Sequence, residues 1–375
     1  MASISLATRL WIRNFNWPLA IASVLVTLLG LLTIQSANLH AAASASGEYR
    51  KQAFSMILGV ALMLVLSNVD YRNWRRWAPI AYGITVLSLI FILIAGHHAQ
   101  GAVRWISLGP FGQFQPSEPA KLFLAITIAA ALCRDSYKRL SDLWLPLLLA
   151  FVPAILILRQ PDLGTTLVIL AILTTQLYLG LPKLAYFAAY FGALIVAAVV
   201  LLKTNIIKPF QKARLLVFLN PKLDPQGAGY NLNQSKIAVG NGGWFGQGLH
   251  HGTQTQLNFV PEHSRDFVFT VLGEELGFAG ALALLIMYSF IIYGGIRTML
   301  VARDRFGYLV AGGLVAMLVF HIMVNIGMTI GIMPITGIPL PFMSYGGSAI
   351  LTDYAAIGIL LNIYSQKDRG VLGNA

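Results

Sequence analysis

Charged residues are scarce in this chain. Only 11% of its 375 residues are Asp, Glu, Lys or Arg, whereas 57% are hydrophobic. A soluble domain contains about 25% charged residues, so this chain cannot cover an ordinary water-exposed surface. The high hydrophobic content also excludes an intrinsically disordered protein. The sequence therefore predicts a protein whose outer surface faces lipid.

Cysteine is nearly absent, and so are the common catalytic signatures. The single Cys133 excludes an internal disulfide and any multi-cysteine metal site. Seven histidines are present, but none has the H-E-x-x-H or a similar metal-ligand spacing. No G-x-S-x-G motif occurs either. Zinc and serine hydrolase chemistry therefore have no support here.

Long apolar runs are what the sequence does contain. A membrane-spanning helix needs about 20 mostly apolar residues. Ten stretches approach that length, namely residues 17–36, 52–68, 78–96, 118–133, 143–158, 163–180, 184–202, 267–293, 307–331 and 348–364. The predicted fold is an all-α polytopic membrane protein of about ten transmembrane helices. It forms one membrane domain, residues 1–375, with a large extracytoplasmic loop, about 203–266, between spans seven and eight.

The distribution of basic residues predicts the orientation. If the N-terminus is cytoplasmic, seven of the 26 Lys and Arg residues lie in the long outer loop and five in the short outer segments. The other fourteen are cytoplasmic, as the positive-inside rule requires for short loops. We expect a multi-pass membrane protein with both termini in the cytoplasm. The net charge of +12 is then assigned to membrane topology, and no nucleic-acid partner is expected.

Charges within or at the ends of spans are costly and indicate function by default. Here they are Glu118, Lys121, Asp162, Asp266, Glu274, Glu275 and Asp353. The first four lie at the predicted outer ends of spans, whereas a transporter more often has its polar site near the bilayer midplane. This distribution favours chemistry at the outer surface.

Two short motifs precede predicted spans, and each has a structural alternative. In residues 115–121, Ser117 is a candidate helix cap, and Glu118 and Lys121 share one helix face. This pair is either a structural ion pair or part of a site. Asp162 is either a plain helix cap, worth about 1 kcal/mol, or a site residue.

The long outer loop is basic, which suits either an anionic lipid headgroup as a ligand or ordinary binding to acidic phospholipids. Its glycine-rich run, residues 240–248, is either a phosphate cradle or, the favoured interpretation, a flexible or tightly turning loop. Asp266 ends the loop as a helix cap or as a general base in a partly dry site. Of Glu274 and Glu275, at least one should point into the bundle. Asp353 needs a partner that the sequence does not name.

The order of motifs resembles the SEDS family (shape, elongation, division and sporulation) of bacterial cell-wall proteins. The motifs are Gln115–Lys121, Gln160–Thr165, Asp224–Tyr230, Gln234–Ala238, the glycine run, Pro261–Glu262, Asp266–Phe267, Glu274–Gly277 and Pro339–Ser348. They occur in order over nearly the whole chain. Residues 251–257 resemble the elongation branch of the family more than the division branch.

The resemblance implies a peptidoglycan glycosyltransferase that polymerises lipid II into β-1,4 glycan strands on the outer face of the plasma membrane. The family's key carboxylate falls on Asp266. Other family positions, some tied to substrate or stability, fall on Arg104, Trp105, Glu118, Lys121, Asp162, Gln211 and Arg214. Inversion at the anomeric carbon needs attack by the acceptor hydroxyl opposite the leaving pyrophosphate, and a base helps to remove the proton of that hydroxyl. We expect Asp266 to be that base.

The resemblance also implies a location in the bacterial plasma (inner) membrane, and it implies partners. These are a class B penicillin-binding protein, the elongation transpeptidase, and other membrane proteins of the elongation machinery. A divalent cation, Mg²⁺ or Mn²⁺, is a candidate cofactor, although the sequence contains no dedicated metal site. Two alternatives to an enzyme are a lipid II flippase and a non-catalytic scaffold. The sequence departs from the family pattern at Ser264-Arg265, where relatives commonly read His-Thr, and at Asp353.

Overall fold

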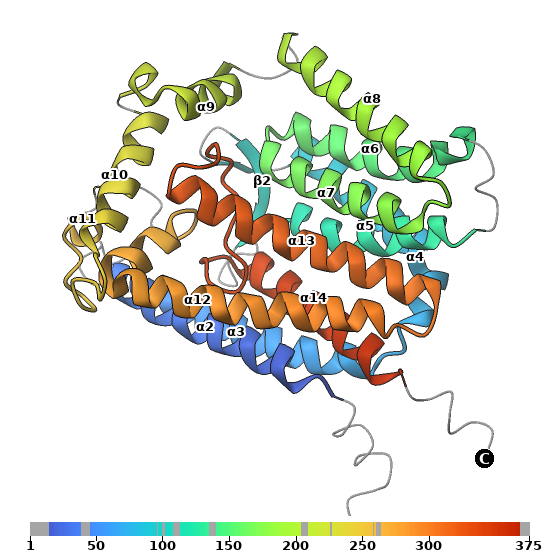
Figure 1. Ribbon diagram of the computed structural model, residues 1–375, viewed down its shortest axis with the longest axis horizontal. Coiled ribbons are helices and arrows are strands. Elements are labelled where there is room, and N and C mark those ends of the chain that lie inside the picture. The colour runs from blue at the N-terminus through green and yellow to red at the C-terminus, as the bar shows by residue number, and fades with distance from the viewer. Residues whose placement is uncertain are drawn as a thin grey trace, which may run out of the picture.

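The chain is described here by a computed structural model. It describes residues 15–38, 46–95, 97–99, 102–107, 113–134, 140–203, 209–225, 227–257, 259 and 264–367. The long helices of these residues lie roughly side by side in one bundle (Figure 1).

Within the described residues, ten helices correspond to the ten predicted apolar stretches. They are α2 (Trp17–Ala37), α3 (Ser46–Asn68), α4 (Arg72–Ala95), α5 (Ser117–Leu132), α6 (Trp144–Arg159), α7 (Leu163–Gly180), α8 (Leu184–Lys203), α12 (Val268–Leu300), α13 (Arg305–Thr329) and α14 (Gly347–Ser365). Seven, α2–α4, α7 and α12–α14, are long and apolar enough to cross a bilayer. The predicted all-helical, multi-pass architecture is confirmed.

The N-terminal end of α2 and the C-terminal end of α14 lie at the same end of the bundle. Asn16, which caps α2, donates a hydrogen bond to the Gly294 carbonyl (3.3 Å). Arg297, one helical turn further along α12, lies over the ring of Tyr364 near the end of α14 (5.6 Å). The described part of the chain therefore crosses the bundle an even number of times.

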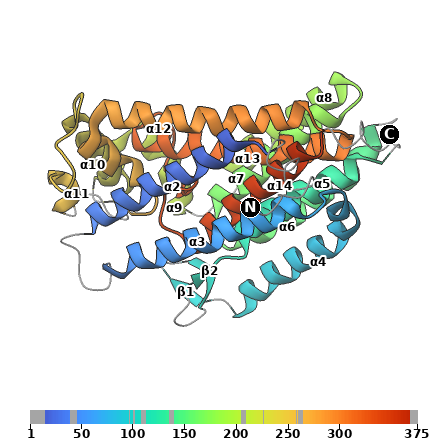
Figure 2. The same cartoon turned by 90° about the horizontal axis from the view of Figure 1, so that it is seen from below.

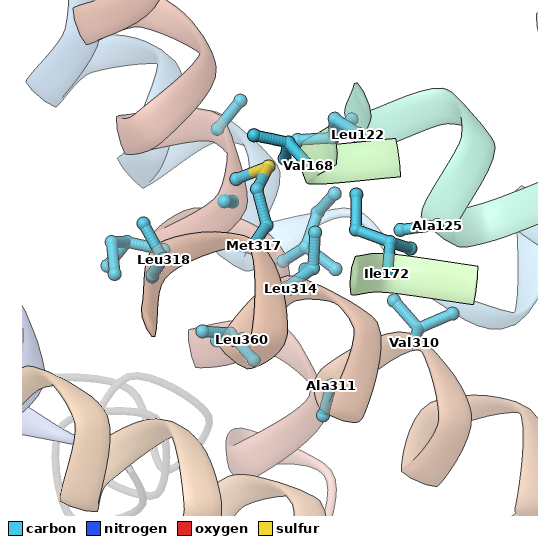
Figure 3. Close-up of a cluster of buried hydrophobic side chains, with 14 of the residues drawn as sticks. Leu122, Ala125, Val168, Ile172, Val310, Ala311, Leu314, Met317, Leu318 and Leu360 are labelled. Carbon is cyan, nitrogen blue, oxygen red and sulfur yellow. The ribbon is translucent and has the colours of Figure 1, made fainter. Parts of the chain in front are cut away.

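The centre of the bundle is formed by α5, α7, α13 and α14. Figure 3 shows Leu122 and Ala125 of α5, Val168 and Ile172 of α7 and Leu314 of α13 in one buried cluster. Lipid tails are as apolar as these side chains, so close van der Waals packing rather than the hydrophobic effect favours their association. The residues of the polar site lie at one end of these packed helices and in the turns beside them.

One feature that the sequence did not predict is a small antiparallel sheet between α4 and α5. Its strands are β1 (His97–Ala99), β2 (Ala102–Ser107) and β3 (Gln113–Phe114), in that order. The strands β1 and β2 lie together near α3 and α4 (Figure 2). A search for runs of about 20 apolar residues cannot detect strands of two to six residues. The sheet matters because β2 carries Arg104 and Trp105.

The outer loop contains helices of its own. These are α9 (Pro209–Leu219), the 3₁₀ turn η3 (Pro221–Leu223), α10 (Ala228–Asn241) and the short α11 (Thr253–Gln256). They lie beyond one end of α12 and α13 (Figure 1), and α10 packs on both of those helices. The loop therefore covers the end of the bundle at which α12 begins.

Candidate functional site

The start of α12, residues 268–276, is a separate helical segment, called the half-helix below. Gly277 has φ 63° and ψ −159°, which breaks α12 after Leu276. The glycine run of the outer loop fills this break, because Phe278 and Ala279 donate their amides to the carbonyls of Gly243 (2.9 Å) and Trp244 (3.0 Å). Polar backbone groups exposed by the break are thus satisfied by the loop.

The same loop also donates hydrogen bonds to α12. The amides of Gln247 and Gly248 donate to the carbonyls of Glu274 and Glu275, both at 3.0 Å. These two amides are therefore unavailable to a phosphate. The glycine run is therefore a tight structural turn, which is one of the two forms of the favoured interpretation. The amides of Gln247 and Gly248 give no support to the alternative, a phosphate cradle.

Both glutamates of α12 point into the protein. Glu274 and Glu275 are fully buried. The Glu274 carboxylate accepts hydrogen bonds from the amides of Gln254 (2.7 Å) and Thr255 (3.0 Å) at the start of α11, and that of Glu275 accepts one from the Ser36 hydroxyl at the end of α2. The two carboxylates thus fasten the outer loop and α2 to the first half of α12.

We expect Gly246→Ala to destabilise the protein strongly. A Cβ at Gly246 would lie 2.0 Å from the Glu275 carbonyl oxygen, and its φ of +80° alone costs about 1–3 kcal/mol for another residue. Gly240→Ala is the matched control, because a Cβ there meets nothing within 4 Å and Gly240 lies in α10. Thermal unfolding in detergent measures both. Equal unfolding temperatures for the two variants would contradict the proposed fit.

Asp266 lies in the turn that leads into this half-helix, and the turn is held along its backbone. Three consecutive carbonyls accept hydrogen bonds from elsewhere in the chain. The Ser264 carbonyl accepts from the Tyr345 amide (2.9 Å), that of Arg265 from the Ser344 hydroxyl (2.6 Å) and that of Asp266 from the Asn325 side chain (2.8 Å). The position of Asp266 is therefore set by α13 and by the segment before α14.

The departure from the family pattern at Ser264-Arg265 has its own contacts. The Ser264 hydroxyl donates to the Glu48 carboxylate (2.9 Å), and the Arg265 guanidinium lies 5.7 Å from the ring centre of Tyr345. Both residues therefore connect the turn to neighbouring elements, in addition to their backbone bonds.

The Asp266 carboxylate and the Arg214 guanidinium both lie close to Gly337. A Cβ at Gly337 would lie 3.2 Å from Asp266 Oδ2 and 3.9 Å from Arg214 Nη1. Burial lowers the pKa of Arg214, and the charge of Asp266 opposes this change. The charges of Arg104 and Asp162 also act on Arg214. Four of the predicted site residues thus share one electrostatic environment.

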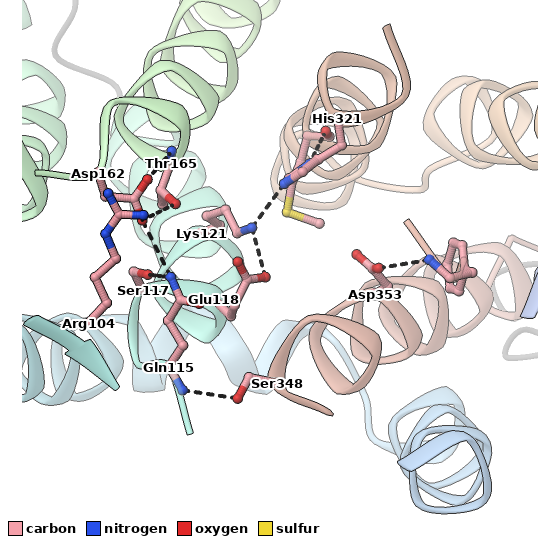
Figure 4. A network of polar contacts seen from close by, with 12 residues as sticks. Arg104, Gln115, Ser117, Glu118, Lys121, Asp162, Thr165, His321, Ser348 and Asp353 are labelled. Carbon is pink, nitrogen blue, oxygen red and sulfur yellow. Dashed lines mark hydrogen bonds and ion pairs between the residues drawn. The ribbon is translucent and has the colours of Figure 1, made fainter. Parts of the chain in front are cut away.

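Arg104 and Asp162 join β2 to the turn between α6 and α7. The carboxylate of Asp162 caps α7, as predicted, by accepting from the Thr165 amide (3.1 Å). Arg104 Nη1 lies 3.9 Å from Asp162 Oδ2, and Arg104 Nε donates to the Gln160 carbonyl (3.1 Å). Figure 4 shows Arg104 beside Asp162 and Thr165. Asp162 is therefore both a helix cap and a member of the polar cluster.

The start of α5 continues this cluster towards the centre of the bundle. Gln115 donates to Ser117 (2.9 Å) and to Asp162 (3.4 Å). The prediction that Ser117 caps α5 is wrong. Pro116 already has helical φ and ψ (−62°, −22°) in the N-cap position and Ser117 is the first helical residue, so the Ser117 hydroxyl accepts from Gln115 instead.

Glu118 and Lys121 form the predicted ion pair, at 2.8 Å between Lys121 Nζ and Glu118 Oε2. Their exposed fractions are 4% and 2%, so the pair is buried rather than at an open surface. Lys121 Nζ also lies 2.9 Å from His321 Nε2 of α13 (Figure 4). Two of the three ammonium protons can thus be directed to protein groups.

Two residues of this site were missed at the sequence level, His321 and Asn325. Both are buried, and with Thr329 they occupy one face of α13 at four-residue spacing. Asn325 donates to the carbonyls of Asp266 (2.8 Å) and Ile338 (2.7 Å). The signal in the sequence is their four-residue spacing, which places polar residues on one face of an apolar span.

Asp353, which lacked a partner at the sequence level, accepts a hydrogen bond from the Phe342 amide (3.1 Å). Phe342 has φ 63°, so this bond stabilises an unusual turn before α14. The partner of Asp353 is therefore a backbone amide of the segment before α14.

The remaining predicted residues lie at the margins. Trp105 is half-buried on β2, next to Arg104 and, by the alternation of a strand, on the opposite face. Gln211 lies in α9, three residues before Arg214, and its side chain is outside the described part of the structure. Among the described residues, no group of three or more His, Cys, Asp or Glu side chains could hold a metal ion.

These features define a polytopic helical membrane protein with a charged site at one end of its bundle. The model of the FtsW/RodA/SpoVE family, described as cell cycle protein, matches residues 16–369. The chain belongs to this family, the SEDS family that the motifs indicated.

Individual relatives extend over the same range. The peptidoglycan glycosyltransferase MrdB of Escherichia coli (strain K12) is 38% identical, with 92% of this chain and 93% of that protein aligned. The stage V sporulation protein E of Bacillus subtilis is 35% identical, with 91% and 95% aligned. A chain in the solved structure of a peptidoglycan synthase complex is 31% identical, with a TM-score of 0.79 and coverage of 94% and 98%. The fold and the family thus agree.

Proposed function

We propose that this chain polymerises lipid II into β-1,4 glycan strands on the outer face of the plasma membrane during cell elongation. The chain is a peptidoglycan glycosyltransferase of the SEDS family, as its relatives are. The observation that carries the proposal is the position of Asp266. Its backbone is held by α13 and the segment before α14, and its carboxylate lies beside Arg214 next to Gly337.

Asp266 is the general base in this proposal. The acceptor hydroxyl attacks the anomeric carbon of the donor in line with the leaving pyrophosphate, and a carboxylate removes its proton, as in inverting glycosidases. Asp266 lies at the start of a membrane helix, where a lipid-linked sugar would leave the bilayer. The three backbone hydrogen bonds on residues 264–266 keep the base in position.

Arg214 is the first candidate for binding the pyrophosphate. Its guanidinium lies near Asp266, and a planar guanidinium can donate two parallel hydrogen bonds to phosphate oxygens. Arg104 is the next candidate, although it also holds the turn before α7. We assign Lys121 and Glu118 a role beneath the site, because both are buried and paired. Trp105 and Gln211 stay expected substrate contacts.

A divalent cation fits this arrangement in one way. Mg²⁺ is usually held by one or two carboxylates together with substrate phosphates. The pyrophosphate and water would supply most of its oxygens, because the Asp266 carboxylate is assigned to the proton of the acceptor hydroxyl. Such a cation would neutralise charge on the leaving group.

The proposed orientation places Asp266 outside and both chain ends in the cytoplasm. The chain is a multi-pass membrane protein. The end of the bundle opposite Asp266 carries most of the basic residues of the short connections, which supports a cytoplasmic location for that end.

A class B penicillin-binding protein is the proposed partner. The solved structure that contains the similar chain is described as the structural coordination of polymerization and crosslinking by a peptidoglycan synthase complex. Polymerisation and crosslinking by two associated proteins would join new strands as they form. We expect the elongation transpeptidase to fill this role, with other elongation proteins in the same membrane assembly.

The test is polymerisation of labelled lipid II by the purified chain, with and without the penicillin-binding protein. Glycan ladders on gels are the expected result. Moenomycin is included to exclude contaminating polymerases of the lysozyme-like class. If the partnered protein makes no polymer, the proposal fails, and lipid II translocation in proteoliposomes then tests the flippase alternative.

A further inference from the structure

A basic pocket lies at the end of the bundle opposite Asp266. It is a cavity of about 700 Å³, lined by Arg72, Arg75, Arg76, Cys133, Asp304, Arg305 and Phe306. The helix α12 begins just after Asp266 and ends just before Asp304, so its full length separates the two sites. The pocket is thus independent of the proposed glycosyltransferase chemistry.

Two of the arginines are held in place by the protein. Arg75 Nη2 donates to the Cys133 carbonyl at the end of α5 (3.4 Å), and Arg305 Nη2 donates to the Gly180 carbonyl at the end of α7 (2.6 Å). A guanidinium has five N–H donors, so one such bond leaves several donors for a ligand. These two arginines therefore have a bonding partner in the wall of the pocket before any ligand binds.

The pocket keeps a positive charge. Four guanidinium groups line it against one carboxylate, that of Asp304. This carboxylate already accepts from the Tyr71 hydroxyl (2.6 Å) and the Gly307 amide (2.7 Å), and it lies 3.6 Å from Arg72 Nε. A single carboxylate with these partners cannot neutralise the pocket. An anion is the complementary ligand.

The helix that supplies three of the arginines continues as a lipid-facing surface. Arg76, Ile80, Ile84 and Leu87 lie on one face of α4 at spacings of three and four residues. The three apolar side chains are strongly exposed, and Trp77 beside Arg76 is 52% exposed. Tryptophan is enriched where a membrane meets water. If the bound anion were a lipid headgroup, its acyl chains would lie along this exposed apolar face of α4.

We propose that this pocket binds the phosphate of an anionic glycerophospholipid in the cytoplasmic leaflet. The guanidinium groups of α4 and α13 would donate to the phosphate oxygens, and the acyl chains would lie along the exposed face of α4. Such a lipid would connect α4, α5 and α13 at their cytoplasmic ends. The assignment to that leaflet rests on the orientation given by the basic residues.

The test compares lipid binding by matched variants of the full-length protein. The pocket variant is Arg75→Gln with Arg76→Gln. The control is Arg134→Gln with Arg303→Gln, which removes the same charge from exposed residues near the pocket that do not line it. Native mass spectrometry and thermal unfolding are measured in detergent with phosphatidylglycerol, phosphatidylcholine or inorganic phosphate.

We expect phosphatidylglycerol to bind the wild type and the control alike. It should bind the pocket variant at least about tenfold more weakly, because two of the four guanidinium groups that line the pocket could no longer donate charge-assisted hydrogen bonds to the phosphate. Equal loss in the control would show non-specific surface attraction and overturn the proposal. Equal binding of phosphatidylcholine, or equal stabilisation by inorganic phosphate alone, would also overturn it. Arg76→Gln alone, which keeps the bond between Arg75 and Cys133, serves if the double variant does not fold.

Discussion

Asp266→Asn is expected to lower the rate of lipid II polymerisation by about 10²–10⁴-fold, the usual effect of losing a general base. The amide has nearly the same shape as the carboxylate but cannot take a proton from the acceptor hydroxyl. The fold should persist, because the contacts that hold this turn use the backbone carbonyls of residues 264–266. Initial rates from glycan ladders, with the penicillin-binding partner present, measure the effect.

Asp224→Asn is the matched control, because Asp224 lies in the same outer loop. Its carboxylate caps α10 by accepting from the Ala228 amide (2.8 Å), and an amide oxygen can accept the same bond. We expect this variant to polymerise lipid II at nearly the wild-type rate. Retention of more than about a tenth of the activity by Asp266→Asn would remove Asp266 from the role of general base.

The second large effect is expected from Lys121→Met. This change leaves the buried Glu118 carboxylate without its ammonium partner. Removal of one member of a buried ion pair costs about 3–5 kcal/mol, because an uncompensated charge stays in an apolar interior. The free energy of unfolding, or the unfolding temperature in detergent, measures the loss. An unfolding temperature equal to that of the wild type would contradict the buried pairing.

The double variant Glu118→Gln with Lys121→Met separates structure from activity. It removes both charges, so most of the stability lost in Lys121→Met should return. With the fold restored, its polymerisation rate tests the role that the pair has for the site above it. A stable but inactive double variant would assign the pair a role in the reaction, whereas a stable and active one would make it purely structural.

Local features of the site were predictable from the sequence. The cap of Asp162 on α7 and the pairing of Glu118 with Lys121 involve residues three apart in the chain. Helix geometry alone brings such residues together. The cap predicted at Ser117 was wrong because Pro116 already has a helical conformation, so Ser117 is the first residue of the helix. Helix ends are uncertain by one or two residues, and a shift of one residue is enough to change the capping residue.

Distant contacts of the site were not predictable. Lys121 and His321 are 200 positions apart, and Asn325 reaches Asp266 from 59 positions away. The fit of the glycine run into the break at Gly277 likewise joins two segments that no local pattern relates. These contacts depend on which helix faces pack together. Apolar periodicity is weak in spans that are hydrophobic all round, so the sequence does not indicate those faces.

The sequence by itself determined the membrane class, the ten spans, the family and the residues most expected to act. Bilayer thickness fixes how long an apolar run must be, and charged residues are costly within it, so both features are visible along the chain. Only the tertiary structure decided that Asp266 and Arg214 both lie close to Gly337, that Lys121 is buried against His321, and that four arginines line a pocket at the opposite end. The physical reason is that these arrangements arise from helix packing and loop docking, which join residues far apart in the chain.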